Sequence, residues 1–304
     1  MSRIVVTGGS GRLGRSLVAG LAARGHEVIS FDRAAAEGLP AAQVSLDLTD
    51  AAATVHALTE ARADAVIHLA AIAVPFSAPE DVILRTNAAL AMSVLGGAVQ
   101  AGIPKIVAAS SPTVLGYGAP LGWTPDRLPL DEESPALPWN AYALSKLLVE
   151  QSIAMMQRQT GDRVRFAAFR PCYVIAPEEW AGAPTQQGHT VRARLDDPAL
   201  SAPALFNYVD ARDVATFADT LLAALGDIPN GEVFFVGADD ALAREPLAGL
   251  LPRFHPGTAA AAAALTGTSP AFSNAKARRL LGWSPAHDWR TELASAHDRT
   301  DVHA

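Results

Sequence analysis

The feature that most constrains this chain of 304 residues is an alternation of short apolar runs with longer helical patterns over its first two thirds. The short runs are rich in β-branched residues and have strand length. Such alternation is typical of a parallel sheet with helices on both faces. The expected strands are Arg3–Thr7, Glu27–Phe31, Val44–Leu46, Ala65–Leu69, Lys105–Ala109 and Arg163–Phe169, and the expected helices are Leu13–Arg24, Ala51–Ala61, Pro79–Ala101 and Asn140–Thr160.

Beyond Pro177 this rhythm breaks. Residues 178–203 are rich in Gly, Pro, Gln and Asp and have no clear period, which predicts loop and small-lobe structure. A helix over Ala211–Leu225, a strand over Gly231–Gly237 and a helix near Asn274–Leu281 are expected to follow. We predict an α/β fold: a doubly wound parallel sheet (Rossmann-type) over residues 1–177, with 207–237 returning to it, and a smaller C-terminal substrate-binding lobe of residues 178–206 and 238–304.

Charge and composition exclude several classes of protein. The formal net charge is −7 and no basic cluster occurs, which argues against a nucleic-acid or membrane-surface partner. The one cysteine, Cys172, cannot form an internal disulfide, and no apolar run reaches the roughly 18 residues that a membrane span needs. We expect a cytoplasmic protein that acts on a small molecule and holds no metal.

A glycine-rich segment, Thr7–Gly14, lies between the first expected strand and the first expected helix. It can be read as Gly9-x-Gly11-x-x-Gly14 or as Gly8-x-x-Gly11-x-x-Gly14. In this context glycine lets the backbone approach a pyrophosphate closely, and the N-terminus of the following helix favours the phosphate charges. The segment therefore predicts a dinucleotide site.

Asp32, at the end of the second expected strand, bears on which dinucleotide binds. A carboxylate there accepts hydrogen bonds from a ribose 2′-hydroxyl and repels a 2′-phosphate, which favours NAD over NADP. Arg33 and Arg12 could instead neutralise a phosphate, or could simply be solvent-exposed. The predicted cofactor is NAD.

Tyr142 and Lys146 lie four residues apart in an expected helix, so they share one face. A neighbouring ammonium favours the phenolate, and we expect Lys146 to lower the pKa of Tyr142 toward working pH, where the phenol can exchange a proton with a substrate hydroxyl. The alternative is a half-buried tyrosine beside a solvated lysine. With 4 Tyr and three Lys in the chain, this spacing is not expected by chance, which favours an acid–base pair.

The Thr7–Gly14 segment and the Tyr142/Lys146 pair together resemble the extended short-chain dehydrogenase/reductase family of NAD-dependent sugar epimerases, dehydratases and dehydrogenases. The resemblance runs from Arg3 to about Pro285 and is specific for fold and chemistry, but much less so for substrate. Further motifs match in order: Asp47-Leu48, His68-Leu-Ala-Ala71, Asn87, Ser110-Ser111, Arg170-Pro171 and Leu281-Gly-Trp-Ser-Pro285.

The resemblance implies Tyr142 as general acid/base, Lys146 as ribose ligand and pKa modifier, and Ser111 as hydrogen-bond partner of the substrate oxygen. Ser111 also follows an apolar strand, at the edge where open sheets bind ligands, although a serine there can simply cap a turn. A homodimer through the helices Pro79–Ala101 and Asn140–Thr160 is implied as well. The cofactor-binding residues so expected are Gly8, Gly11, Arg12, Leu13, Gly14, Asp32, Arg33, Asp47, Leu48, Leu69, Ala70, Ala71, Asn87, Tyr142, Lys146 and Pro171.

Two positions depart from the nucleotide-sugar members of the family. Tyr173 stands where they usually carry an Asn that helps to hold the sugar phosphate, and Phe206 where they often carry a diphosphate-binding Arg. Arg192 and Arg194 could compensate, or could simply be solvated. Ser110–Gly118 resembles the equivalent stretch of uronate dehydrogenases, and Ala119–Trp139 reads equally as a lid or as a surface loop. The expected substrate-binding residues are Ser111, Pro112, Trp139, Tyr173 and Arg192.

These features predict an NAD-dependent oxidoreductase that uses Ser111, Tyr142 and Lys146 for hydride transfer at a hydroxyl or carbonyl of a sugar-like, uronate-like or other polar small molecule. One alternative is a nucleotide-sugar epimerase or dehydratase that recycles the hydride internally. A second is a protein that senses NAD or NADP without catalysis. The Tyr142/Lys146 pair weighs against the sensor.

Overall fold

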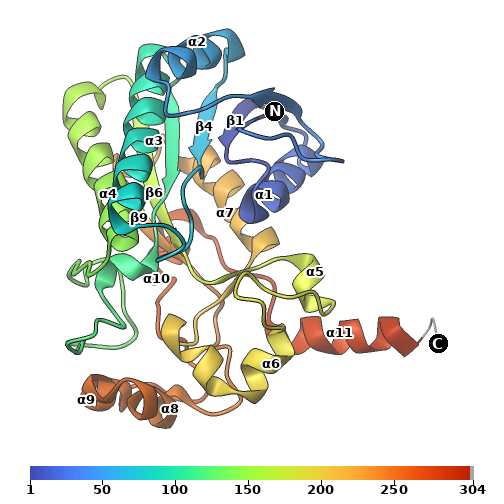
Figure 1. Cartoon of the computed structure of the whole chain (residues 1–304), viewed down its shortest axis with the longest axis vertical. Helices are drawn as coiled ribbons and strands as arrows, with labels where there is room; N and C mark the ends of the chain where they lie inside the picture. The colour runs from blue at the N-terminus through green and yellow to red at the C-terminus, as the bar shows by residue number, and fades with distance from the viewer. Residues whose placement is uncertain (302–304) are drawn as a thin grey trace. The chain divides into compact units, whose positions relative to one another are not determined.

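The computed structural model of the chain describes residues 1–301 (Figure 1). Its strands are β1 (Arg3–Thr7), β2 (Glu27–Asp32), β3 (Ala42–Ser45), β4 (Ala65–His68), β5 (Lys105–Ala109), β6 (Arg165–Pro171), β7 (Val174–Ile175), β8 (Val209–Asp210) and β9 (Glu232–Val236). Its α-helices are α1 (Arg12–Ala23), α2 (Ala51–Ala61), α3 (Glu80–Gln100), α4 (Ala141–Thr160), α5 (Pro177–Trp180), α6 (Val191–Asp196), α7 (Ala211–Ala224), α8 (Leu247–Phe254), α9 (Ala259–Ala262), α10 (Ala275–Leu281) and α11 (Trp289–Asp301). Four 3-10 helices are η1 (Pro112–Leu115), η2 (Pro198–Leu200), η3 (Ala202–Ala204) and η4 (Pro256–Thr258).

Seven strands form one sheet in the order β3-β2-β1-β4-β5-β6-β9, and neighbours from β3 to β6 pair in parallel. The chain winds outward from β1 in one direction to β3 and then, from β4, in the other. The order therefore reverses between β1 and β4, which is where open α/β sheets bind their ligands. The doubly wound fold predicted from the alternation is confirmed.

Helices cover both faces of this sheet, which explains why its strands read as continuous apolar runs. On one face, α2, α3 and α4 share a buried core with the strands, with Leu58, Val94 and Val149 at its centre. On the other face lie α1 and α7 (Figure 1), and Phe217 of α7 packs its ring 5.7 Å from that of Phe169 in β6.

Helix α3 is one residue shorter at each end than the predicted Pro79–Ala101. An 18-residue window within it has a mean hydropathy of 1.5, so by length and composition alone it passes the test for a membrane span, although Arg85 and Asn87 fall within it and no uninterrupted apolar run of that length occurs. Half of that window is buried, because α3 packs between α2 and α4. The buried half of the window is therefore accounted for by the core.

Two compact units are formed by the chain. The first comprises Met1–Val114, Ala136–Arg170 and Ala215–Phe234, and it contains the sheet strands through most of β6 with α1 to α4. The second comprises Leu115–Pro135, Pro171–Val214 and Phe235–Ala304. The sequence prediction assigned residues 171–177 to the dinucleotide-binding domain, whereas in the structure they belong to the second unit. The prediction also extended the smaller lobe to residue 304, and residues 302–304 lie outside the described part of the chain.

Within the second unit, the segment expected to be loop contains short helices, so that prediction was wrong in part. Helix α6 is capped by Thr190, whose side chain accepts from the Ala193 amide, and α5 begins with Pro177 in its first turn. A helix of one or two turns is too short to show a hydrophobic period, which is why composition suggested a loop.

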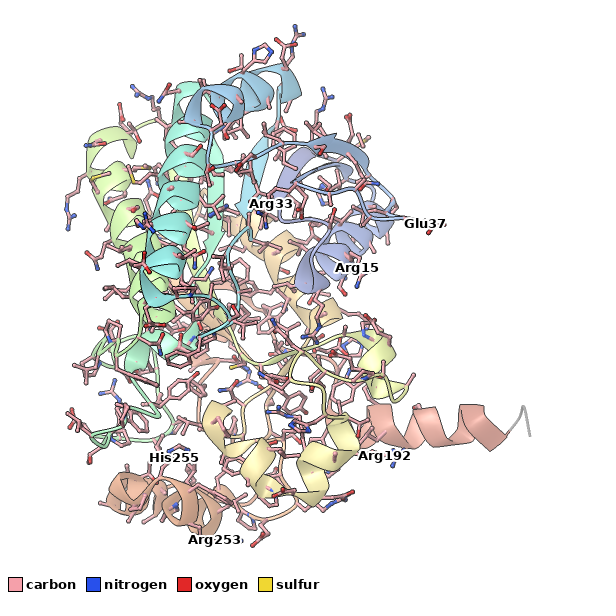
Figure 2. The ribbon with its side chains drawn as sticks, in the orientation of Figure 1. Arg15, Arg33, Glu37, Arg192, Arg253 and His255 are labelled. Atoms are coloured by element: carbon pink, nitrogen blue, oxygen red, sulfur yellow. The ribbon has the colours of Figure 1, made fainter. Side chains whose placement is uncertain are left out.

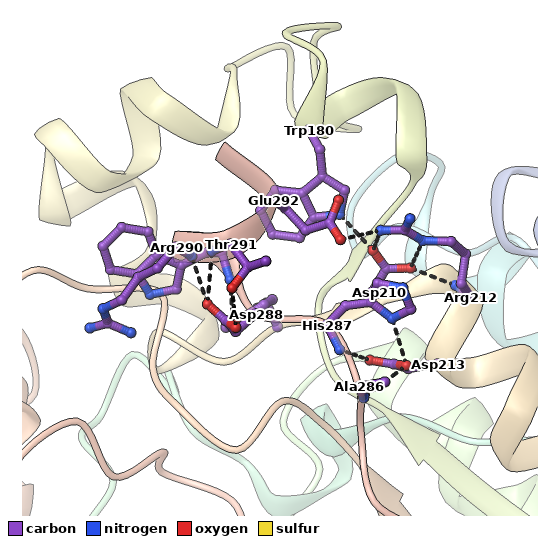
Figure 3. Close-up of polar contacts among 12 residues, drawn as sticks. Trp180, Asp210, Arg212, Asp213, Ala286, His287, Asp288, Arg290, Thr291 and Glu292 are labelled. Carbon is purple, nitrogen blue, oxygen red and sulfur yellow. Dashed lines mark hydrogen bonds and ion pairs between the residues drawn. The ribbon is translucent and has the colours of Figure 1, made fainter. Parts of the chain in front are cut away.

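Within the second unit, two buried aspartates hold residues 286–292 in place (Figure 3). Asp210 accepts hydrogen bonds from Arg212 and from the Trp180 indole, and Arg212 also pairs with Glu292 of α11. Asp213 accepts from the amides of Ala286 and His287 and from His287 Nδ1. Both carboxylates are fully buried and satisfied, so they serve structure.

Candidate active site

Tyr142 and Lys146 lie in the first two turns of α4 and are nearly fully buried, with 9% and 5% of their surfaces exposed. The helix starts where it does because the Asn140 side chain caps it, accepting from the Ala143 amide at 2.9 Å. Lys146 Nζ donates to the carbonyl of Ala109, the last residue of β5, and lies 5.9 Å from the centroid of the Tyr142 ring. The lysine thus joins helix α4 to the carboxyl end of the sheet.

Ser111 follows β5 by two residues, and its side chain lies near enough to the Tyr142 phenol to lower the pKa of that group in part. Its own Oγ accepts from the Thr113 hydroxyl at 2.9 Å, which orients it at the start of η1. Both Ser111 and Tyr142 are buried, so their side chains are shielded from bulk water. The structure therefore brings together the three residues that the sequence grouped as Ser111, Tyr142 and Lys146.

The predicted effect of Lys146 on the acidity of Tyr142 was wrong for the protein alone. Burial raises the pKa of Tyr142 to about 12, and the interaction with Ser111 offsets this only partly. Burial likewise lowers the pKa of Lys146 to about 8. Removing both charged forms from water outweighs their mutual attraction, because the phenolate and the ammonium are each penalised by desolvation.

This burial predicts a pH dependence of stability. The pKa of Lys146 is about 8 in the folded chain and near 10.4 in the unfolded chain. Between these pH values the unfolded chain binds one more proton than the folded chain, so the free energy of unfolding should rise with pH by up to about 1.4 kcal/mol per pH unit. Below about pH 8 both states bind the proton, so the slope vanishes and the cost of the buried ammonium is present in full. Urea unfolding of wild type and Lys146→Met between about pH 7 and 10 measures it; parallel profiles would contradict the assignment.

Glu150 is a site residue that the sequence analysis missed. It lies four residues after Lys146 on α4, is buried, and accepts from the Ser110 hydroxyl at 2.5 Å. Arg170, at the carboxyl end of β6, donates to both of its carboxylate oxygens at 2.8 Å. Tyr142, Lys146 and Glu150 therefore form one stripe at four-residue steps, and that spacing was the signal available in the sequence.

The glycine-rich segment forms a tight loop at the switch point between β1 and β4. Gly8 has φ +73°, and a Cβ on it would lie 2.8 Å from the Ala70 amide nitrogen. Side chains at Gly9 and Gly14 would collide with Ser30 and with the Gly8 carbonyl respectively. The glycines of both readings of the motif are therefore required, because a side chain at Gly8, Gly9 or Gly14 would collide with a different neighbour.

Helix α1 begins directly after this loop, with Gly11 as an N-cap residue that has no side chain to satisfy the first amides. Arg12 and Leu13 occupy its first two positions. Asp32 ends β2 beside the loop, and its carboxylate accepts from the Ser10 amide at 3.1 Å and from the Arg33 amide at 2.7 Å. Arg33 is exposed (Figure 2).

The other cofactor residues expected from the resemblance line the same end of the sheet. Leu69 and Ala70 hydrogen-bond to Thr7, and Ala71 follows them. Asp47 accepts from the amide and hydroxyl of Thr49, hydrogen bonds that lower its pKa, while Leu48 is buried in the core.

Asn87 and His68 brace these segments with buried hydrogen bonds. The Asn87 amide accepts from the Ile72 amide at 2.7 Å and donates to the Ser145 hydroxyl at 3.0 Å. His68 Nδ1 lies 2.8 Å from the Thr7 hydroxyl, and burial lowers the pKa of the imidazole to about 3, so it is neutral. Both side chains hold the protein's own loops in place.

The expected substrate residues are divided between the two units. Pro112 opens η1 next to Ser111, and Trp139, 37% exposed, lies with its ring 5.6 Å from that of Phe76; both belong to the first unit. Tyr173 and Arg192 belong to the second unit, as does Pro171. Arg192, which Figure 2 labels, donates from Nη2 to the Leu293 carbonyl at 3.1 Å.

Residues 4–237 match the model of the NAD dependent epimerase/dehydratase family. A UDP-glucose 4-epimerase from Mycolicibacterium smegmatis is 29% identical over 319 residues, covering 93% of each chain. A UDP-glucose 4-epimerase from Azospirillum brasilense is 35% identical over 158 residues, which are 50% of this chain and only 43% of that protein, so the match spans less than half of the relative.

Among solved structures, a short-chain dehydrogenase/reductase superfamily protein from Agrobacterium tumefaciens with bound NAD superposes with a TM-score of 0.72 at 25% identity, covering 99% of this chain and 98% of the other. The family model spans most of the chain, including the glycine-rich loop, Ser111 and the Tyr142/Lys146 pair. The chain therefore belongs to the NAD dependent epimerase/dehydratase family and is an NAD-dependent enzyme of the extended short-chain dehydrogenase/reductase type.

Proposed function

We propose that this enzyme transfers a hydride between NAD and a carbon that bears a hydroxyl or carbonyl group, with Tyr142 as general acid/base. The observation that carries the proposal is the burial of Ser111, Tyr142 and Lys146 at the carboxyl end of β5, with Lys146 Nζ 5.9 Å from the Tyr142 ring centroid and bonded to the Ala109 carbonyl. Oxidising an alcohol requires a base for the hydroxyl proton and an acceptor for the hydride. The protein supplies the base, and NAD supplies the acceptor at its nicotinamide ring.

The residues around the switch point fit a dinucleotide. The Gly8–Gly14 loop leaves space that side chains would fill, and the first amides of α1 lack a side-chain cap, which suits a pyrophosphate. Asp32 offers a carboxylate to a ribose hydroxyl, and Lys146 reaches the sheet edge with an ammonium whose pKa is near working pH. These residues are proposed to hold NAD.

In the proposed reaction, Tyr142 Oη takes the proton of the substrate hydroxyl as the carbon loses its hydride, and returns it in the reverse direction. Ser111 holds the substrate oxygen beside that phenol. A positive charge on Lys146 favours the phenolate when the cation and the nicotinamide ribose lie close to it, which opposes the effect of burial on Tyr142. The phenol thereby alternates between donor and acceptor.

The substrate proposed is a sugar-like or other polar small molecule that is oxidised or reduced in net terms. The missing nucleotide-sugar contacts support this choice: Phe206 is buried against Phe254, with ring centroids 5.9 Å apart, and cannot serve as an anion ligand. Tyr173 replaces the expected Asn. A uronate remains one candidate on the resemblance of Ser110–Gly118.

A second candidate function is epimerisation, in which the hydride returns to the same substrate. It is favoured by the near-full-length similarity to a UDP-glucose 4-epimerase. Incubating the enzyme with NAD and a panel of free sugars, uronates and UDP-sugars separates the two, because net oxidation accumulates NADH whereas epimerisation yields product without it. A chain that binds NAD and converts no member of the panel would favour the sensor.

Asp32 is proposed to select NAD. Asp32→Ala should weaken NAD binding by about tenfold or more, since a charge-assisted hydrogen bond is worth about 1.5–3 kcal/mol, while NADP binding should improve because the repulsion of its 2′-phosphate is removed. Titration of both cofactors by calorimetry measures the change. Equal affinity of the wild type for NAD and NADP would contradict the assignment.

We also propose a homodimer through α3 and α4. Four apolar side chains are exposed on these helices, between 37% and 47% each: Met92, Leu144, Leu148 and Met155. Leu148→Glu should shift the sedimentation-equilibrium mass from dimer to monomer, whereas Val44→Glu, on the equally exposed strand β3, should leave it unchanged. A wild type that sediments as a monomer would refute the proposal. A cytoplasmic location remains a prediction.

A further inference from the structure

Two arginines of helix α6 lie in contrasting surroundings within the second unit. Arg192 is partly exposed and donates to the Leu293 carbonyl. Arg194, two positions later, is only 3% exposed, and its guanidinium donates a single hydrogen bond, from Nη1 to Gln187 Oε1 at 3.2 Å. Its Nε–H is buried and has no acceptor among the residues that the structure describes.

Two side chains contact the Arg194 guanidinium, the Tyr173 ring and the Gln187 amide. The central guanidinium carbon lies 4.1 Å from the centroid of the Tyr173 ring, so one face is covered by an aromatic surface. The Tyr173 hydroxyl also donates to Gln187 Oε1. One amide oxygen therefore receives two donors, one from Tyr173 and one from Arg194, while the buried Nε–H of Arg194 stays unused.

The nearest carboxylate acts on Arg194 only at a distance. Glu179 is buried and attracts the guanidinium, but one of its oxygens accepts from the Ala176 amide in the first turn of α5, and no ion pair joins it to Arg194 within the described residues. Burial lowers the pKa of Arg194, and electrostatic interactions with Tyr173 and Glu179 oppose this only in part. A cation out of water without a paired anion is costly, and buried charges in proteins are normally paired.

We propose that Arg194 and Tyr173 form an oxyanion site that takes a carboxylate or phosphate group of the ligand. Gln187 Oε1 stands where an oxygen of that group would accept from Arg194 Nη1 and from the Tyr173 hydroxyl, and Nε–H would serve a second oxygen. Gln187 is exposed in the loop between α5 and α6, so it is the partner that the ligand displaces. Arg guanidinium groups match the planar pair of oxygens of such anions.

The inference rests on the proposed function in one respect: it implies that the substrate of the hydride transfer carries an anionic group. The existence of an oxyanion site at Arg194 does not depend on the proposed function. The site includes Tyr173, one of the two positions at which a nucleotide-sugar contact was expected to be missing, and is separate from the other, Phe206. Arg194 offers this chain an anion contact from α6 instead.

Calorimetric titration of the intact protein with inorganic phosphate, UDP, glucuronate and uncharged glucose tests the site. At least one oxyanion probe should bind, and Arg194→Met should weaken that binding by about ten- to a hundredfold, the loss expected for a charge-assisted hydrogen bond. Arg253→Met, an exposed arginine of α8 in the same unit and the matched control, should change it less than about twofold. Preference for UDP or for glucuronate distinguishes a phosphate from a carboxylate.

Gln187→Ala supplies a readout that a structural role would not move. Because it removes the competing amide oxygen from an exposed loop, it should tighten binding of the same probe several-fold, whereas Arg194→Met weakens it. Failure of every probe to bind, equal binding by Arg194→Met, or weaker binding by Gln187→Ala would overturn the inference. NAD binding and turnover measured on the same samples keep the outcomes separate: turnover without oxyanion binding refutes only this site, and oxyanion binding without turnover refutes only the proposed function.

Discussion

Tyr142→Phe should lower turnover by about 10²–10⁴-fold, the usual contribution of a positioned general acid/base. The substitution removes one hydroxyl from a buried side chain and leaves the ring that packs beside Lys146. NAD binding should stay close to that of the wild type, because the glycine-rich loop and Asp32 are untouched. Steady-state kinetics on a converted substrate, with calorimetric titration of NAD, measure both quantities.

The partner Ser111 provides the control for this prediction. Ser111→Ala should also lower turnover, and the double variant should be no slower than about the worse single variant, because residues that act as a unit give non-additive losses. A Tyr142→Phe enzyme with normal turnover would end the assignment. Additive losses would show that the two hydroxyls act separately.

Arg170→Met should destabilise the fold by about 3–5 kcal/mol, the cost of leaving a buried charge without its partner. Arg170 and Glu150 are 5% and 7% exposed and form two hydrogen bonds of 2.8 Å. Once Arg170 is gone, the Glu150 carboxylate keeps only the Ser110 hydroxyl among these partners. The double variant Glu150→Gln/Arg170→Met should lose less, because no uncompensated charge remains. Urea unfolding measures these differences.

An exposed ion pair on α3 is the matched control. Arg85 and Asp81 are 75% and 69% exposed and lie at the same 2.7–2.8 Å separation as the buried pair. Arg85→Met should cost no more than about 1 kcal/mol, because water screens such pairs. If Arg170→Met and Arg85→Met had similar effects, the buried pair would not hold β6 to α4 as described.

The fold could be predicted from sequence because its central strands are buried on both faces. β1, β5 and α2 have the bounds that their patterns predicted, and other sheet elements differ by one or two residues at their ends. The small unit could not be predicted in the same way. Its helices α5 and α6 are too short to show a period, and their positions depend on caps and contacts distant in sequence.

Within the site, the spacing of residues in the sequence identified only side chains that lie on one helix. Tyr142 and Lys146 were found because residues four apart share a face. Glu150 continues that stripe, but its partners Ser110 and Arg170 come from two different strands, so its role needed the sheet order. Sequence could place a positive charge near Tyr142, but burial, which raises the pKa of the phenol, is a property of the folded chain.

The same limit applies to α6. Arg192 was preferred as a substrate contact and Arg194 only mentioned beside it, because two arginines in a polar segment look alike. Residues two apart point to different sides of a helix, and only the fold decides which side is buried. Arg194 proves to be the buried one, against Tyr173.

The central claim, hydride transfer governed by Tyr142, is tested most directly by following deuterium. The enzyme is incubated with NAD and with UDP-glucose deuterated at C4 or glucuronate deuterated at C1, and cofactor and product are analysed by mass spectrometry. The account predicts deuterium on the nicotinamide ring with net oxidation, or retained in the product with epimerisation, and neither with Tyr142→Phe. Product whose deuterium has been lost to water would contradict it, since that outcome requires proton abstraction from carbon instead of hydride transfer.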